Sequence, residues 1–138
     1  MIAVIDTNVI VSGLLRPFSD PARILVLILS GKITLAYDSR IINEYEEVLK
    51  RKKFNFSSHH VQSIIAEIKG EGVYVSAVPL KGSLPDRDDE PFLEVALSGK
   101  INVLVTGNKR HFPAEFAKDV QILTPSEFLD FYKNIDSM

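Results

Sequence analysis

The sequence predicts an α/β domain in which helices cover both faces of a mainly parallel sheet. The first observation is a series of short apolar runs, a pattern typical of strands buried on both faces. The second is that helical segments lie between most of these runs. Parallel strands need crossover connections, and helices are the usual ones. The alternation therefore predicts a three-layer α/β/α sandwich.

The expected strands are the apolar runs themselves. They lie at residues 2–5, 33–37, 73–78, 101–105 and 120–123. A chain of 138 residues with 46% hydrophobic content is long enough to bury a core. We therefore expect a single domain over residues 1–138.

The first expected helix lies in the stretch SDPARILVLILSGK. Asp20 is the expected N-cap, Pro21 takes the first helical position and Gly31 ends the helix. Its apolar residues surround the helix, so we expect burial on most sides. The second helix lies in DSRIINEYEEVLKRKKF, where the apolar residues share one stripe of a helical surface. Those residues are Ile41, Ile42, Tyr45, Val48 and Leu49.

Three more helices are expected further along the chain. One starts at about Ser57 and ends at Gly70 and Gly72. Its inward residues are Val61, Ile64, Ile65 and Ile68. Another lies in DDEPFLEVALSGK, which is acidic at its start and ends at glycine. The last begins at TPSE, where Thr124 caps the helix and Glu127 completes a capping box.

Composition excludes several classes of protein. The formal charge of −2 and the pI of about 5.9 argue against a sequence-independent nucleic-acid binder. The absence of cysteine excludes disulfides and zinc-thiolate sites, and it fits a reducing cytosol. No apolar run approaches the roughly 20 residues of a membrane span. We therefore expect a cytoplasmic protein without a membrane segment.

Polar residues gather where strands end and helices begin. Asp6 directly follows the first strand, and the sequence TGN at residues 106–108 follows the fourth. Residues 86–90, DRDDE, open a helix. In open α/β sheets ligands bind outside the carboxyl ends of the strands. Asp6 could instead form an Asx turn, and the acids at 88–90 could simply favour a helix N-terminus.

The helix from Ser39 carries three glutamates whose direction matters. At about 100° per residue, Glu44 and Glu46 fall on opposite shoulders of the apolar stripe, and Glu47 points outward. Helical periodicity therefore leaves Glu44 and Glu46 as equal candidates for a site. A solvated surface glutamate is the alternative for each.

The remaining polar cluster suits a hard metal ion. The sequence contains no P-loop, dinucleotide fingerprint or G-x-S-x-G elbow. His59, His60 and His111 lack a metal-ligand spacing. What is left is a set of carboxylate and amide oxygens, which are the ligands of Mg²⁺ or Mn²⁺.

Four stretches together resemble the PIN-domain nucleases. They are IDTNVIVSGLL, NEYEEVL, DRDDEPFLEVALSGKINVLVTGNKRHFP and ILTPSEFL, in this order over essentially the whole chain. The resemblance is strongest to the branch of toxin components of prokaryotic toxin-antitoxin pairs. It implies an α/β/α sandwich whose acidic residues bind Mg²⁺ or Mn²⁺ and cleave RNA.

The resemblance also assigns the candidate site residues. It implies that Asp6, Glu44 and Asp89 are catalytic and bind the metal, and it thereby favours Glu44 over Glu46. Asp86 and Asp88 are close enough to share the role. At the fourth family position this chain has Asn108, where many relatives have aspartate. An amide brings no charge, so a second metal ion would be held more weakly.

Further residues are expected to contact the substrate or orient the acids. Asn8 would orient Asp6, and Ser12 and Thr106 could hydrogen-bond a phosphate or a metal-bound water. Lys109 and Arg110, next to His111, are the expected contacts for the RNA backbone. The run KRKK at residues 50–53 is a second candidate, although a solvated helix C-terminus explains it equally well.

The resemblance implies a small antitoxin protein and a homodimer as further partners. Two other functions remain open. A degenerate PIN-like module would bind RNA or protein without turnover, and Asn108 favours it. A phosphatase of the haloacid dehalogenase type, or a receiver-like domain, would use the aspartate at the strand end. The dehalogenase class needs a second aspartate where this chain has Asn8, and neither class explains Glu44.

Overall fold

Five parallel strands form the central sheet of the computed structural model, which describes residues 1–136. Each strand pairs in parallel with its neighbours. The order across the sheet is β3 (Val73–Tyr74), β2 (Thr34–Tyr37), β1 (Ile2–Ile5), β4 (Val103–Val105) and β5 (Gln121–Leu123). The predicted α/β class with a parallel sheet is therefore confirmed.

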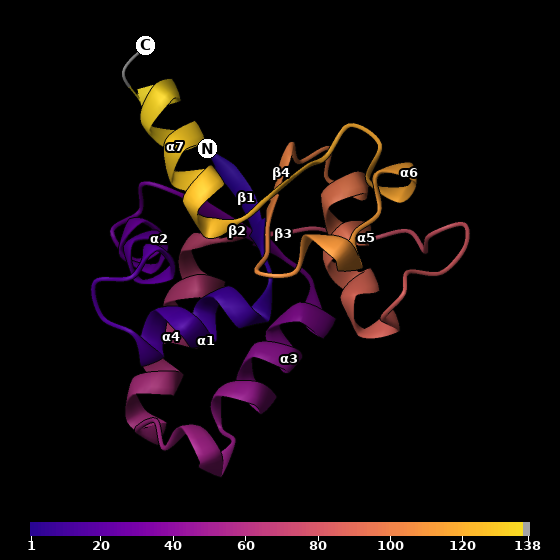
Figure 1. Ribbon diagram of the computed structural model, residues 1–138. Coiled ribbons are helices and arrows are strands. Elements are labelled where there is room, and N and C mark those ends of the chain that lie inside the picture. Colours follow the sequence, from indigo (N-terminus) through magenta and orange to yellow (C-terminus); the bar gives the residue numbers. More distant parts are fainter. Residues whose placement is uncertain (137–138) are drawn as a thin grey trace.

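Helices cover both faces of this sheet. Figure 1 shows α2, α4 and α7 on one side of the strands and α5 and α6 on the other. The buried strand residues between them belong to β2, β1 and β4, and they include Val4, Leu35 and Leu104. The helices are α1 (Thr7–Leu15), α2 (Asp20–Leu29), α3 (Ser39–Leu49), α4 (Ser58–Glu71), α5 (Glu90–Ser98), α6 (Ala114–Ala117) and α7 (Pro125–Asp136). Short 3₁₀ turns are η1 (Lys52–Phe54), η2 (Arg87–Asp89) and η3 (Lys109–His111).

The carboxyl ends of the strands lie at one edge of the sheet. In Figure 1, β1 starts near the N-terminus at the top and runs down to α1, and the chain leaves β4 at the same lower edge. From β1 the chain continues to β2 on one side, whereas β4 lies on the other side of β1. Such a switch point leaves a crevice at the carboxyl ends of the two strands. Asp6 and Thr106 directly follow β1 and β4 there.

The third strand is shorter than the apolar run predicts. Sheet pairing covers Val73 and Tyr74, opposite Ala36 and Tyr37 of β2. Val75 N–H still donates to Tyr37 O at 2.8 Å, but β2 ends at Tyr37 and β3 lies at the edge of the sheet, so the residues after Val75 have no neighbouring strand to pair with. Val78 N–H instead donates to the hydroxyl of Ser98 at 2.9 Å. The expected strand at 73–78 is therefore correct only at its start.

The helix starting near residue 20 differs from expectation in two ways. Its N-cap is Ser19 rather than Asp20, because the Ser19 hydroxyl accepts a hydrogen bond from Ala22 N–H at 3.2 Å. Burial is confined to one face: Ile24 and Ile28 are buried, whereas Val26 is 64% exposed. By contrast, the capping box of α7 is confirmed, with Thr124 and Glu127 exchanging hydrogen bonds of 2.9 and 3.2 Å.

None of the helices within residues 1–136 has the length and apolar character to cross a membrane.

Candidate metal centre at the carboxyl edge of the sheet

Asp6 is a buried carboxylate at the start of α1. Its backbone N–H donates to Val105 O at 2.9 Å, which ties the end of β1 to the end of β4. Its Oδ2 accepts hydrogen bonds from the Thr106 hydroxyl at 2.7 Å and from Asn8 Nδ2 at 3.3 Å. Burial raises the pKa of Asp6, and the Thr106 hydrogen bond offsets part of that rise. The carboxylate is thus held in one orientation.

Glu44 approaches Asp6 from α3, which packs beside α1. Its carboxylate accepts a hydrogen bond from the Thr7 hydroxyl. Burial raises the pKa of Glu44, and the nearby charges of Asp6 and Asp88 raise it further. The neighbouring residue Tyr45 is fully buried and donates a 2.5 Å hydrogen bond to Ile5 O. That bond fixes α3 against the end of β1, with Glu44 on the side facing Asp6.

Asp89 completes the group of acids at the junction of η2 and α5. Its Oδ2 lies 2.8 Å from Nδ1 of His111 on η3. Burial and the charges of Asp6 and Asp86 raise the pKa of Asp89 to about 6, although His111 opposes the rise. A raised pKa in several adjacent acids is the expected result of burial, to which the like charges that share one site add for Glu44 and Asp89.

These acids open into one cleft of about 350 Å³. Its lining residues are Asp6, Thr7, Asn8, Val11, Ser12, Glu44, Val48, Arg51, Phe54, Asp86, Asp88 and Asp89. Asp86, Asp89 and His111 each offer a ligand atom, and these atoms lie within 4.8 Å of one another. Carboxylate oxygens with one imidazole suit a divalent cation such as Mn²⁺ or Mg²⁺. The residues therefore fit the metal that the sequence predicts.

Other sequence-predicted residues lie less directly at the cleft. The Thr106 hydroxyl is completely buried and donates to Asp6, so it is directed at the carboxylate and not at a phosphate. Lys109 Nζ pairs with Glu127 at 3.0 Å, and Arg110 is exposed. Asn108 is exposed, and its backbone N–H donates to Thr106 Oγ1. Asn108 does not line the cleft of the described chain, so its role as a metal ligand stays a prediction.

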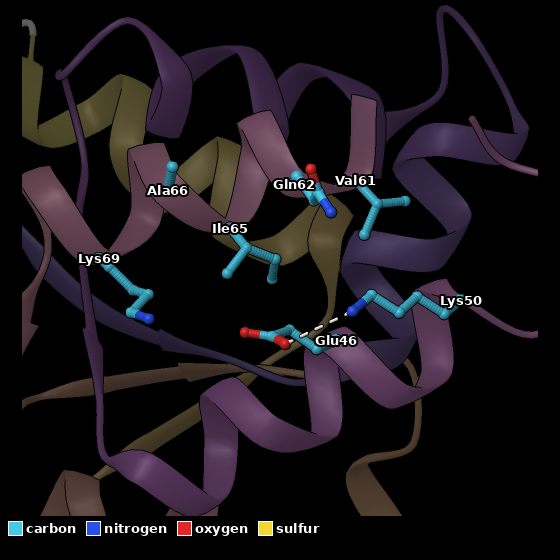
Figure 2. Close-up of a pocket in the computed structure, with 7 residues that line it drawn as sticks. All are labelled: Glu46, Lys50, Val61, Gln62, Ile65, Ala66 and Lys69. Atoms are coloured by element: carbon cyan, nitrogen blue, oxygen red, sulfur yellow. Dashed lines mark ion pairs between the residues drawn. The ribbon is translucent and has the colours of Figure 1, made fainter. Parts of the chain in front are cut away.

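The other two glutamates of α3 face elsewhere. Glu47 is exposed and pairs with Arg51 at 3.2 Å. Glu46 pairs with Lys50 at 3.7 Å and lines a separate hollow of about 240 Å³ between α3 and α4. Figure 2 shows Glu46 and Lys50 facing Ile65 and Lys69 of α4 across this hollow. Of the two candidates that periodicity left open, Glu44 is the one in the acidic cleft.

Several residues at the cleft were missed by sequence reasoning. His111 was considered only as a cation next to the site, because it lies in a loop with no metal-ligand spacing. Thr7 carries no signal beyond its place beside Asp6. Phe54 follows the basic run KRKK, which was a candidate RNA contact and includes Arg51, but Phe54 itself was not named. Only its aromatic character beside that run could have pointed to it.

Comparison with known proteins gives consistent results. Residues 3–110 match the family model described as PIN domain. The protein MJ1680 of Methanocaldococcus jannaschii is 26% identical over an alignment of 145 residues. The alignment covers 97% of this chain and 93% of that protein.

Solved structures of toxin-antitoxin complexes have a similar fold. FitAcB from Neisseria gonorrhoeae matches with a TM-score of 0.57 at 25% identity, over 91% of this chain and 99% of that one. VapBC2 from Rickettsia felis, bound to a DNA fragment from its promoter, matches with a TM-score of 0.59 at 19% identity. That match covers 90% of this chain and 98% of the other. These structural neighbours are VapC and FitB toxins of toxin-antitoxin systems.

Proposed function

Because the chain belongs to the PIN-domain family, we propose that its acidic cleft is the active site of a metal-dependent endoribonuclease. One observation carries the proposal: the carboxylates of Asp6, Glu44 and Asp89 converge on one cleft although burial raises the pKa of each, and the charges of neighbouring acids raise the pKa of Glu44 and of Asp89 further. Ionised carboxylates in such a group need a cation. Placing these acids together lowers the folding stability of the metal-free chain, and this cost favours a functional reason for the arrangement.

A bound Mg²⁺ or Mn²⁺ ion would supply Lewis-acid stabilisation of the charge that develops on a phosphoryl group during hydrolysis. Asp6, Glu44 and Asp89 would hold the ion, with Asp86 and Asp88 beside them. His111 would join through its imidazole, and Asn108 could contribute an amide oxygen.

The chain's own hydrogen bonds orient these acids before any ligand binds. Thr106 fixes Asp6, and Thr7 fixes Glu44. The pair of Asp89 and His111 can hold a proton between Oδ2 and Nδ1, 2.8 Å apart. The Ser12 hydroxyl lines the cleft and is available to a phosphate oxygen of RNA. Lys109 and Arg110 remain candidates for the RNA backbone outside the cleft.

We further propose that the protein is the toxin of a toxin-antitoxin pair and acts on RNA in the cytoplasm. The support is the similarity to FitAcB and VapBC2, whose structures contain antitoxin partners. An RNA-binding module without turnover is the second candidate. The neutral Asn108, at the position where the family resemblance implies an aspartate, favours it.

The test is cleavage of end-labelled RNA by the purified chain with Mg²⁺, with Mn²⁺ and with EDTA. We expect cleavage with either metal, loss in EDTA, and recovery when metal is added back in excess. Asp6→Asn, purified in parallel, controls for contaminating nuclease because contamination would persist in that preparation. Cleavage that survives chelation would contradict the metal mechanism. Binding of RNA without cleavage would favour the second candidate.

A further inference from the structure

Basic and aromatic residues reach the rim of the acidic cleft just after α3. We call residues 51–56 the rim segment; within it, Arg51 and Phe54 line the same cleft as Asp6 and Glu44. We propose that Phe54 stacks on an unpaired base of the RNA, so that the cleft selects single-stranded over paired RNA. This inference rests on the proposed nuclease function, and what it adds is a residue of this chain that contacts the base and selects an unpaired strand.

The ring of Phe54 has a rigid support. It stacks on Phe56, with ring centroids 5.6 Å apart and an interplanar angle of 14°. Phe56 packs against the hydrophobic core of the described chain, whereas Phe54 is not part of that packing. Between them, Asn55 adopts a left-handed conformation with φ of 54°, which asparagine tolerates better than most residues. The turn at Asn55 therefore holds a partly exposed ring at the cleft on a partner that is itself packed against the core.

A cationic side chain lies beside this ring, and a second one lines the same cleft. Lys53 Nζ lies 5.0 Å from the centroid of Phe54. Among residues 1–136, the Arg51 side chain is held only by an exposed ion pair with Glu47 at 3.2 Å, a kind of pair that contributes little. An entering base would displace the flexible Lys53 side chain, which could then meet a phosphate of the same strand. Proteins that bind single strands combine basic side chains with aromatic rings in this way.

The position of Phe54 explains why paired RNA would be disfavoured. In an A-form duplex each base is already stacked and paired, and the grooves do not present its face to a side chain. A single strand can turn one base onto Phe54 while its phosphodiester lies at the carboxylates. The same cleft then contacts both the base and the phosphate.

Another exposed aromatic residue offers a matched control. Phe18, between α1 and α2, is 94% exposed and does not line the cleft. Phe18→Leu therefore makes the same chemical change as Phe54→Leu at a site that the proposal does not involve. Phe54→Tyr keeps an aromatic face and serves as the conservative variant.

The experiment measures binding and cleavage separately. Binding of a fluorescein-labelled 12-nucleotide RNA, single-stranded or annealed to its complement, is followed by anisotropy with Mn²⁺ in an Asp6→Asn background, which does not cleave. We expect Phe54→Leu to weaken single-strand binding about 5- to 100-fold, since one stacked base contributes on this scale. Phe54→Tyr and Phe18→Leu should stay within about two-fold, and duplex binding should not respond to Phe54→Leu. In the native background, KM for the single strand should rise while kcat changes little.

The outcomes separate this inference from the proposed function. If Phe54→Leu cleaves the single-stranded RNA as efficiently as the wild type does, the inference is overturned and the proposed nuclease function is not affected. Binding that depends on Phe54 without any cleavage by the native chain would overturn the nuclease and keep the base contact. The inference would also be overturned if the chain with its native rim segment bound single-stranded and duplex RNA with equal affinity. Thermal unfolding should show all variants folded, because Phe54 lies outside the core packing.

Discussion

The hydroxyl of Thr106 donates a hydrogen bond of 2.7 Å to Oδ2 of Asp6, and the two residues are separated by 100 positions in the chain. They directly follow β4 and β1, which are neighbours in the sheet. Thr106 Oγ1 also accepts from Asn108 N–H at 3.0 Å, so the hydroxyl is itself oriented. The orientation of Asp6 is therefore a consequence of strand order, and it exists without a bound ligand.

Replacing Thr106 with valine tests this relationship. Thr106→Val removes the hydrogen bond that lowers the pKa of the buried Asp6. At pH 7 the free energy of unfolding should fall by about 1–3 kcal/mol, because a buried acceptor loses its partner. Thr106→Ser keeps the hydroxyl, so its free energy of unfolding should fall less than that of Thr106→Val. Denaturant unfolding at pH 7 and pH 4 measures both. The deficit should shrink at pH 4, where more of the Asp6 carboxyl is protonated, and an equal deficit at both pH values would contradict the role of the ionised carboxylate.

The glutamates of α3 give a second prediction. Glu44→Gln should reduce cleavage by at least about 100-fold, because a metal ligand loses its charge, while an oxygen remains to accept from Thr7. In EDTA it should raise the melting temperature, because it relieves repulsion with Asp6 and Asp88. For a domain of this size, roughly 3–5 °C corresponds to each kcal/mol. Calorimetry and initial cleavage rates measure the two effects.

Glu46→Gln and Glu47→Gln are the matched controls on the same helix. Each removes one partner of a surface ion pair with Lys50 or Arg51, and such pairs contribute little. Both variants should cleave like the wild type and melt within about 1 °C of it. An inactive Glu46→Gln beside an active Glu44→Gln would mean that the wrong face of α3 has been assigned to the site.

Much of the sheet could be predicted because strands buried on both faces consist of apolar residues. The first helix could not. Residues 7–15, TNVIVSGLL, continue the apolar run of β1 and contain several β-branched residues, which do not favour a helix. Packing decides the outcome there: a Cβ at Gly13 would lie 2.9 Å from Pro21 O, so α1 and α2 approach closely at that glycine.

The site was only partly predictable for a similar reason. Asp6 is identifiable from sequence because it ends a buried strand. The choice between Glu44 and Glu46 depends on tertiary contacts, namely the bond from Tyr45 to Ile5 O and that from Thr7 to Glu44. His111 reaches Asp89 through the path of the loop after β4, which no periodicity encodes.

Asn108 gives a prediction about metal affinity. Asn108→Asp adds a carboxylate just beyond β4, close to the end of the strand that carries Thr106. If position 108 faces the ion, the added charge should tighten Mn²⁺ binding several-fold and lower the metal concentration that gives half-maximal cleavage. Asn102→Asp, exposed at the opposite end of β4, is the control for net charge. Calorimetric titration with Mn²⁺ compares the three chains. Equal affinity in all of them would remove Asn108 from the metal site.

The raised pKa of Asp89 predicts how the stability of the metal-free protein depends on pH. Its pKa in the folded chain is about 6, above the ordinary value of about 3.9 for aspartate. The folded state therefore binds this proton more tightly than the unfolded state does. Ionisation of Asp89 consequently destabilises the fold as pH rises from about 4, and the loss is complete above about pH 6. The raised pKa values of Asp6 and Glu44 act in the same direction.

Asp89→Asn should therefore match the wild type near pH 4 and exceed its melting temperature at pH 7. The melting temperature of Asp89→Asn should still fall somewhat as pH rises, because Asp6 and Glu44 still titrate. Asp130→Asn, an exposed acid on α7, should keep the full slope of the wild type and so controls for net charge. Melting temperatures from pH 4 to pH 8 in EDTA measure the effect. Saturating Mn²⁺ should narrow the gap at pH 7, because the ion stabilises the ionised carboxylates of the wild type. If Asp89→Asn is no more stable than the wild type at pH 7 in EDTA, burial and repulsion at this carboxylate do not limit the stability of the metal-free chain.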